Sequence, residues 1–165
     1  MEVGKWLWVR LIGISIKKIT IKLSQRFSMI NTVNKQIIQN FIQVVWCYGD
    51  IDALKDFWTE DCINHAMLSD NNQGLEALRL YHESFLDSFS AFSDIKIELI
   101  QQIEESDRVT THMNSTVLHS GTFMGIPATG RHVFLASMRI DRIKNGKIAE
   151  HWSISDVPGL MQQLQ

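Results

Sequence analysis

The chain from residue 31 to about residue 90 spaces its apolar residues with the period of an α-helix. One apolar face runs from Asn31 to Gly49 and consists of Ile37, Ile38, Phe41, Val44 and Val45. Gly49 is expected to end this helix, and Asp50 or Asp52 to cap a second one over ALKDFW. DCINHAM then runs into the polar loop LSDNNQG, and a third helix is predicted after Gly74, with the apolar set Leu75, Leu78, Leu80, Tyr81, Phe85 and Phe89.

After Phe92 the apolar period changes from that of a helix to two, which is typical of strands. A first strand is marked by Ile95, Ile97, Leu99 and Ile103, and a second runs from Val109 to Leu118. Residues 132–143 form a third, and residues 148–157 return as the last one after an Asn-Gly turn. Three helices followed by four antiparallel strands predict an α+β fold, with the helices on one face of a curved sheet.

The Asn145-Gly146 turn predicts how the last two strands pair. If Lys144 faces Lys147, each residue i faces residue 291 − i. One face then carries Val133, Leu135, Ser137 and Arg139 with Trp152, Ile154 and Asp156. The other carries Phe134, Ala136, Met138 and Ile140 with His151, Ser153 and Ser155. Both faces are apolar enough to need cover, so we expect helices on one and a second copy of the chain on the other, in a homodimer.

Composition and charge narrow the classes of function. With 45% hydrophobic and 21% charged residues the chain can form a folded core. Residues 1–28 carry six basic groups against Glu2 alone, so the rest of the chain holds 10 basic and 17 acidic groups. Such a surface argues against nucleic-acid binding. No apolar run approaches the ~20 residues of a membrane span. Cys47 and Cys62 do not have the spacing of a metal site or of a disulfide framework. We expect them to be buried thiols in a protein of the reducing cytoplasm.

Residues 1–28 form a basic, apolar leader that differs from the rest. Arg10 splits its apolar run, and no small-residue cleavage site follows. We interpret the leader as an upstream extension of the reading frame, with Met29 as the true start, or as a targeting segment. Either way it is expected to lie outside the fold, with the domain spanning residues 29–165.

The second half of the chain carries a specific set of motifs: HSGTFMGIPATGR, an apolar strand, KNGKIAEHWSISD and the closing GLMQQL. Together they resemble the SnoaL-like polyketide cyclase, or ester cyclase, family. The resemblance covers Asn34 to Leu164, and Ala128 departs from it where the family has a second proline. It implies the cone-shaped α+β fold of nuclear transport factor 2-like proteins, with the glycine-rich loop at the mouth of the cone.

The resemblance also suggests an active site. It implies that Asp156, the aspartate of HWxxxD, is the catalytic acid/base; the alternative from the residues alone is an aspartate that caps the following turn. An apolar setting beside Trp152 and Ile154 would raise the pKa of the carboxyl toward the range that is useful for proton transfer. His65 is the second catalytic candidate, as a donor that holds an enolate oxygen. His151 lies on the opposite strand face from Asp156 unless a bulge changes the alternation.

The expected ligand is a small apolar molecule that contains carbonyl groups. His119 could donate a hydrogen bond to such a carbonyl or could anchor the loop, and the pocket wall would include Leu135, Trp152 and Ile154. The histidines show neither HxxxH nor HxH spacing, and phosphate- and dinucleotide-binding motifs are absent, so no metal and no cofactor are expected. Three functions remain open: a cofactor-free enzyme for intramolecular aldol closure, a carrier without chemistry, and a hydrolase or isomerase that uses the same pocket.

Overall fold

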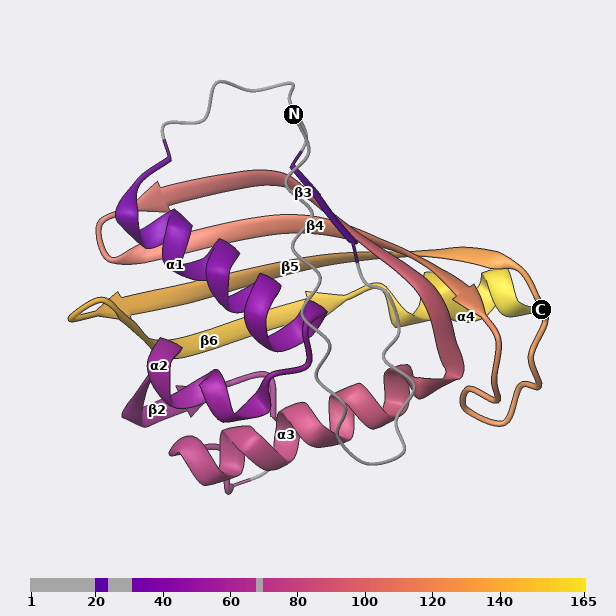
Figure 1. Ribbon diagram of the computed structural model, residues 1–165, viewed down its shortest axis with the longest axis horizontal. Helices are drawn as coiled ribbons and strands as arrows, with labels where there is room; N and C mark the ends of the chain where they lie inside the picture. Colours follow the sequence, from indigo (N-terminus) through magenta and orange to yellow (C-terminus); the bar gives the residue numbers. More distant parts are fainter. Residues whose placement is uncertain (1–19, 24–30, 68–69) are drawn as a thin grey trace.

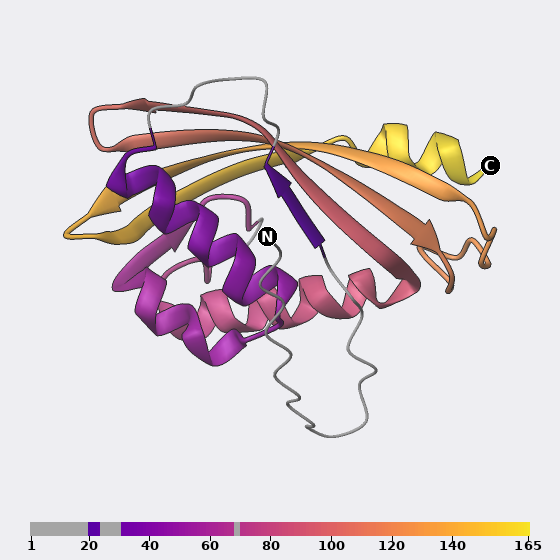
Figure 2. The ribbon, with the colours of Figure 1, turned by 45° about the horizontal axis from the view of Figure 1, so that its top comes forward.

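A computed structural model describes residues 20–23, 31–67 and 70–165 and shows helices packed on a curved sheet (Figure 1). The sheet has six strands in the order β1-β3-β4-β5-β6-β2. Three helices, α1 to α3, lie on one side of the sheet, and α4 lies on the other side near one end (Figure 2). The α+β class with helices segregated to one main face is therefore confirmed, and so is the nuclear transport factor 2-like arrangement.

Apart from α4, for which no helix was predicted, and Leu80, which is exposed, the helices follow the predicted apolar faces. They are α1 (Val33–Phe41), the π-helix Ile42–Cys47, the 3-10 turn Ile51–Ala53, α2 (Leu54–Phe57), α3 (Leu75–Ser88), the 3-10 turn Phe89–Ala91 and α4 (Val157–Leu164). The Thr32 side chain caps α1 by accepting a hydrogen bond from the amide of Lys35, and Asp50 caps the turn before α2 in the same way. The predicted second helix is shorter than expected, because Trp58 already begins a strand.

The strands are β1 (Thr20–Leu23), β2 (Trp58–Asn64), β3 (Phe92–Glu105), β4 (Arg108–His119), β5 (His132–Lys144) and β6 (Lys147–Ser155). The four antiparallel strands β3 to β6 are those that the sequence predicted. Two short parallel strands, β1 beside β3 and β2 beside β6, complete the edges of the sheet. β2 falls in a segment to which the pattern assigned no element.

The edge strand β1 corrects the expectation for the leader. It lies within residues 1–28, so the prediction that this segment stays outside the fold is wrong for Thr20–Leu23. The physical reason is that the edge of β3 offers unpaired backbone groups to any extended segment that reaches it. Residues 1–19 and 24–28 lie outside the described residues.

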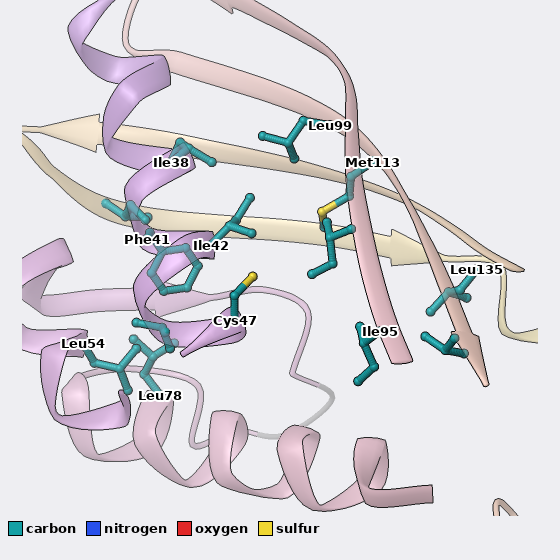
Figure 3. Close-up of a cluster of buried hydrophobic side chains, with 14 of the residues drawn as sticks. Ile38, Phe41, Ile42, Cys47, Leu54, Leu78, Ile95, Leu99, Met113 and Leu135 are labelled. Carbon is teal, nitrogen blue, oxygen red and sulfur yellow. The ribbon is translucent and has the colours of Figure 1, made fainter. Parts of the chain in front are cut away.

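The core lies between the helices and the concave face of the sheet (Figure 3). Ile38, Phe41 and Ile42 come from the first helical segment and are fully buried. They face buried side chains of the sheet such as Leu99 and Met113. The helices therefore cover the concave face of β3 to β6, and this face carries the candidate functional side chains.

A bulge in the β5–β6 hairpin changes which side chains share a face. The first two pairs, Lys144 with Lys147 and Ile143 with Ile148, follow the predicted register, but the next pair is Arg142 with Glu150. Ala149 is therefore an extra residue on β6, and both it and Ile148 are buried. From there to Ser155 every β6 side chain points to the opposite face from the one predicted. The predicted register is wrong beyond this point.

The bulge exchanges two sets of side chains. His151, Ser153 and Ser155 join Arg139 on the concave face, whereas Trp152 and Ile154 point to the convex face. The convex face also exposes apolar side chains of β5, namely Phe134, Met138 and Ile140. This uncovered surface is the feature that the predicted homodimer would bury.

The homodimer stays a prediction that light scattering can test. The protein is expected to have the mass of two chains at micromolar concentration, and Ile154→Lys should raise the dissociation constant by roughly tenfold or more because Ile154 is 80% exposed on this face. Leu80→Lys, on the exposed side of α3, is the control and should leave the mass unchanged. A stable wild-type monomer would contradict the prediction.

Candidate active site

A cavity of about 80 Å³ lies between the helices and the concave face of the sheet. One wall is mostly aromatic and includes Trp46, Tyr81, His82, Phe85 and Phe89 from the helical segments, together with Trp58 at the start of β2. Its sheet wall includes Met113, Leu135, Ser137, Arg139, His151 and Ser153. The cavity is far smaller than the roughly 300–1,000 Å³ of pockets that enclose a drug-sized ligand, so in this form it admits only part of a larger molecule.

Three buried polar side chains form a connected unit beside this cavity, and two of them, Arg139 and His151, line it. Arg139 donates two hydrogen bonds to the Asp141 carboxylate, from Nε at 2.7 Å and from Nη2 at 2.6 Å. His151 Nδ1 lies 2.8 Å from Oδ1 of the same carboxylate. Asp141 is completely buried, and Arg139 and His151 are 1% and 5% exposed. The three come from adjacent positions on β5 and β6, where Asp141 pairs directly with His151.

The charges in this unit fix the protonation states. Burial alone would raise the pKa of Asp141, but the charge of Arg139 and the contacts with His151 outweigh it and lower the pKa. Burial, together with the positive charge of Arg139, lowers the pKa of His151 in spite of the nearby carboxylate. His151 is therefore neutral at neutral pH. Since Nδ1 must carry the proton that Asp141 accepts, Nε2 keeps its lone pair.

His82 is a second buried histidine on the cavity wall. It comes from α3 and packs against Phe41, with ring centroids 5.7 Å apart, and its two ring nitrogens have no hydrogen-bond partner among the described residues. Burial, followed by the charge of Arg139, lowers the pKa of His82 to about 3. The imidazole is thus neutral over the whole range in which the protein would work.

Asp156 does not lie at this cavity. It is exposed, and its side chain caps α4 by accepting a hydrogen bond from the Gly159 amide at 2.9 Å. This is the alternative considered from the sequence, an aspartate that caps the turn. The prediction that placed Asp156 in an apolar pocket is wrong, because the bulge turns Trp152 and Ile154 outward and the strand ends at Ser155.

His65, Trp152 and Ile154 likewise lie away from the cavity. The ring of His65 stacks on Trp152 at 4.4 Å, and its Nε2 lies 3.0 Å from Glu150, which also accepts hydrogen bonds from Arg142. These contacts give His65 a structural role at the surface. Ile154 is largely exposed on the convex face.

The two remaining predicted residues have different outcomes. Leu135 lines the cavity, as expected. His119 is buried outside it and anchors the glycine-rich loop: its Nδ1 accepts a hydrogen bond from the Thr129 amide at 3.2 Å and lies 3.1 Å from Oγ1 of Thr129. Gly125 and Gly130 in this loop have positive φ angles, which explains two of its glycines. Among the described residues, no group of three or more His, Cys, Asp or Glu side chains could hold a metal ion.

Acid should weaken the fold through these histidines. The pKa of His82 is 6.5 in an unfolded chain and about 3 in the folded one, so the unfolded state binds a proton that the folded state rejects. Stability is then complete above pH 6.5 and falls as the pH drops toward 3, by up to about 1.4 kcal/mol per pH unit for each such histidine. Urea unfolding at pH 6 and pH 5 should show this loss, and His82→Phe should reduce it. Equal pH dependence in the two proteins would contradict the account.

Residues 36–164 match the family model of the SnoaL-like polyketide cyclases. No curated protein matches the chain. No helix in the described part of the chain is long and apolar enough to span a membrane.

Several solved structures share the fold. A candidate polyketide cyclase from Acidithiobacillus ferrooxidans has a TM-score of 0.70 and 21% identity, over 82% of this chain and 96% of that one. IdmH from Streptomyces antibioticus, described as a candidate polyketide cyclase, has a TM-score of 0.66 and 26% identity, over 79% and 97%. AclR from Streptomyces galilaeus, described as a candidate hydroxylase, has a TM-score of 0.63 and 25% identity, over 79% and 94%. The chain thus belongs to the SnoaL-like polyketide cyclase family.

Proposed function

We propose that this protein is a cofactor-independent enzyme that removes a proton beside a carbonyl group and closes a ring by an intramolecular aldol reaction. The catalytic base in this proposal is His151, in place of Asp156. The observation that carries it is the buried Asp141–His151 pair on the wall of the cavity, with Nε2 of His151 free to accept a proton. The cyclase descriptions of several structural relatives agree with this chemistry.

The reaction follows from the protonation states. Nε2 of the neutral His151 accepts a proton from a carbon that lies next to one or two carbonyl groups. The resulting enolate carbon attacks another carbonyl carbon of the same molecule, so that a carbon–carbon bond forms and the attacked oxygen becomes an alkoxide. Protonated His151 then returns its proton to that alkoxide. The product is an isomer of the substrate, and no oxidant, reductant or cofactor takes part.

Asp141 has a positioning role in this scheme. Its carboxylate holds the Nδ1 proton of His151, which fixes the tautomer, and it stabilises the imidazolium that forms during the reaction. Arg139 keeps that carboxylate ionised through its two short hydrogen bonds. Removing Asp141 would leave the Arg139 guanidinium buried without its carboxylate, and removing Arg139 would leave the buried carboxylate without a compensating charge; breaking a buried pair in this way typically costs about 3–5 kcal/mol of stability. His151 is therefore the better residue for testing catalysis.

The small volume of the cavity bears on the kind of substrate. A molecule larger than a single ring would place only its reactive end among Trp46, Tyr81 and Phe85, with the rest outside. Single-ring aromatic β-keto esters are suitable probes, because they present an acidic C–H between two carbonyls on a small apolar group.

His151→Gln tests the base directly. Enzyme-dependent uptake of deuterium from D2O at the carbon between the two carbonyls, followed by NMR, should fall by about 10² or more, because glutamine accepts no proton at neutral pH. Asp156→Asn is the matched control: asparagine is an equally good helix cap, so both the exchange rate and the melting temperature should stay near those of the wild type.

Two other outcomes would contradict a catalytic role of His151. Loss of exchange in Asp156→Asn with normal exchange in His151→Gln would show that Asp156 is the base and that this proposal is wrong. Binding of the probes by the wild-type protein without any exchange would favour the carrier function.

A further inference from the structure

We propose that the cavity contains a binding site for an oxyanion, formed by hydrogen-bond donors from Trp46, Trp58, His82 and Arg139. Its ligand would be the oxygen of an enolate, or of an enol or phenol that ionises when it binds. The role of this site during catalysis rests on the proposed function, because the enolate would form there. The binding of an oxyanion at this site does not rest on that function.

These four side chains have buried polar atoms without hydrogen-bond partners. Nε1 of Trp46, Nε1 of Trp58, Nη1 of Arg139 and both ring nitrogens of His82 are buried and make no hydrogen bond with any described residue. All four side chains line the same cavity. Arg139 and His82 are at least nine-tenths buried. Buried polar groups are nearly always satisfied, so such a gathering of exceptions at one cavity suggests a missing ligand.

These four side chains also lie close to one another. The guanidinium carbon of Arg139 lies 5.3 Å from the ring centroid of Trp46. The ring of His82 lies 6.3 Å from that of Trp46 and 6.5 Å from that of Trp58. The ring of Trp58 lies 6.0 Å from that of His151, the proposed base. A ligand atom near Nε2 of His151 would therefore lie beside this group of donors.

The unpartnered atoms indicate which kind of ligand atom would satisfy them. The tryptophan Nε1–H and the arginine Nη1–H can only donate hydrogen bonds, whereas a neutral His82 has one ring nitrogen that donates and one that accepts. Donors therefore outnumber acceptors at this site, and its main requirement is a ligand atom that accepts hydrogen bonds. Donors placed where negative charge develops act most strongly in a buried, water-poor site.

The backbone of the first helical segment supports this assignment. Trp46 lies in the π-helix Ile42–Cys47, where the wider turn includes the bond from the Tyr48 amide to the carbonyl of Gln43. Such turns are rare and often occur at functional sites. Here the π-helix carries Trp46 at the cavity, between Phe41 and Phe85.

The charge balance distinguishes an oxyanion that forms in place from a permanent carboxylate. Arg139 and Asp141 neutralise each other, so a carboxylate would bring an uncompensated charge into a buried site. An enol or phenol enters neutral, and its proton can pass to His151, whose imidazolium then balances the oxyanion. The site should therefore prefer weakly acidic enols and phenols to carboxylates.

Absorbance titration of 4-nitrophenol tests the site without turnover, because its ionised form alone absorbs in the visible. At a pH about one unit below the pKa of free nitrophenol, the bound molecule should be mostly ionised in the wild-type protein. Trp46→Phe and Trp58→Phe each remove one N–H and keep an aromatic ring, so each should lower the ratio of ionised to neutral bound nitrophenol by roughly tenfold. Trp152→Phe, on the convex face, is the matched control and should change nothing.

The inference is overturned if nitrophenol does not bind, if it binds in the neutral form, if neither cavity variant differs from the wild type, or if Trp152→Phe has the same effect. Failure of the proposed function looks different: ionised nitrophenol would bind through the two tryptophans, but the β-keto esters would show no exchange. Normal exchange with unchanged binding in both variants would retain the proposed function and reject the oxyanion site.

Discussion

The Asp141 carboxylate is an ionised group with no exposure to water, and much of the surrounding structure serves to hold it. An unpaired charge in such a place would cost far more than the fold could supply, so Arg139 and His151 must both reach it. The Arg139 guanidinium is covered in turn by Phe41 and Trp46. The first helix, the π-helix and the β5–β6 hairpin are thus tied together around one carboxylate.

The bulge at Ala149 is what makes this arrangement possible. Without the extra residue, His151 would point to the convex face and Trp152 would face Arg139 across the hairpin. With it, the two polar residues of β5 gain a histidine partner from β6, and the cavity gains the serines of the same strand. The convex face receives Trp152 and Ile154 instead, which makes that face more apolar. One backbone irregularity therefore determines both the chemistry of the cavity and the character of the opposite surface.

The amino-acid sequence predicted the elements better than it predicted the site. Periodicity identified α1, α3 and the four long strands, and the motifs of the second half indicated the family. The Asn145-Gly146 turn specifies only the pairs next to it, and one inserted residue reverses every later side chain. That error placed Trp152 and Ile154 beside Asp156, which the family resemblance had suggested as the catalytic residue, and it kept His151 out of the predicted site. In the sequence, the bulge was indicated by two adjacent apolar residues, Ile148 and Ala149, but the run IAEHW is equally compatible with the regular alternation of a strand.

The state of the His151 ring tests the account most directly. Long-range ¹H–¹⁵N NMR of the imidazole, assigned by comparison with His151→Gln, reports which nitrogen carries the proton. The account predicts a neutral ring with the proton on Nδ1 that becomes protonated only at a lower pH than a free histidine, because burial and the charge of Arg139 lower the pKa of His151. A ring that titrates as in a free histidine, or that carries its proton on Nε2, would contradict it.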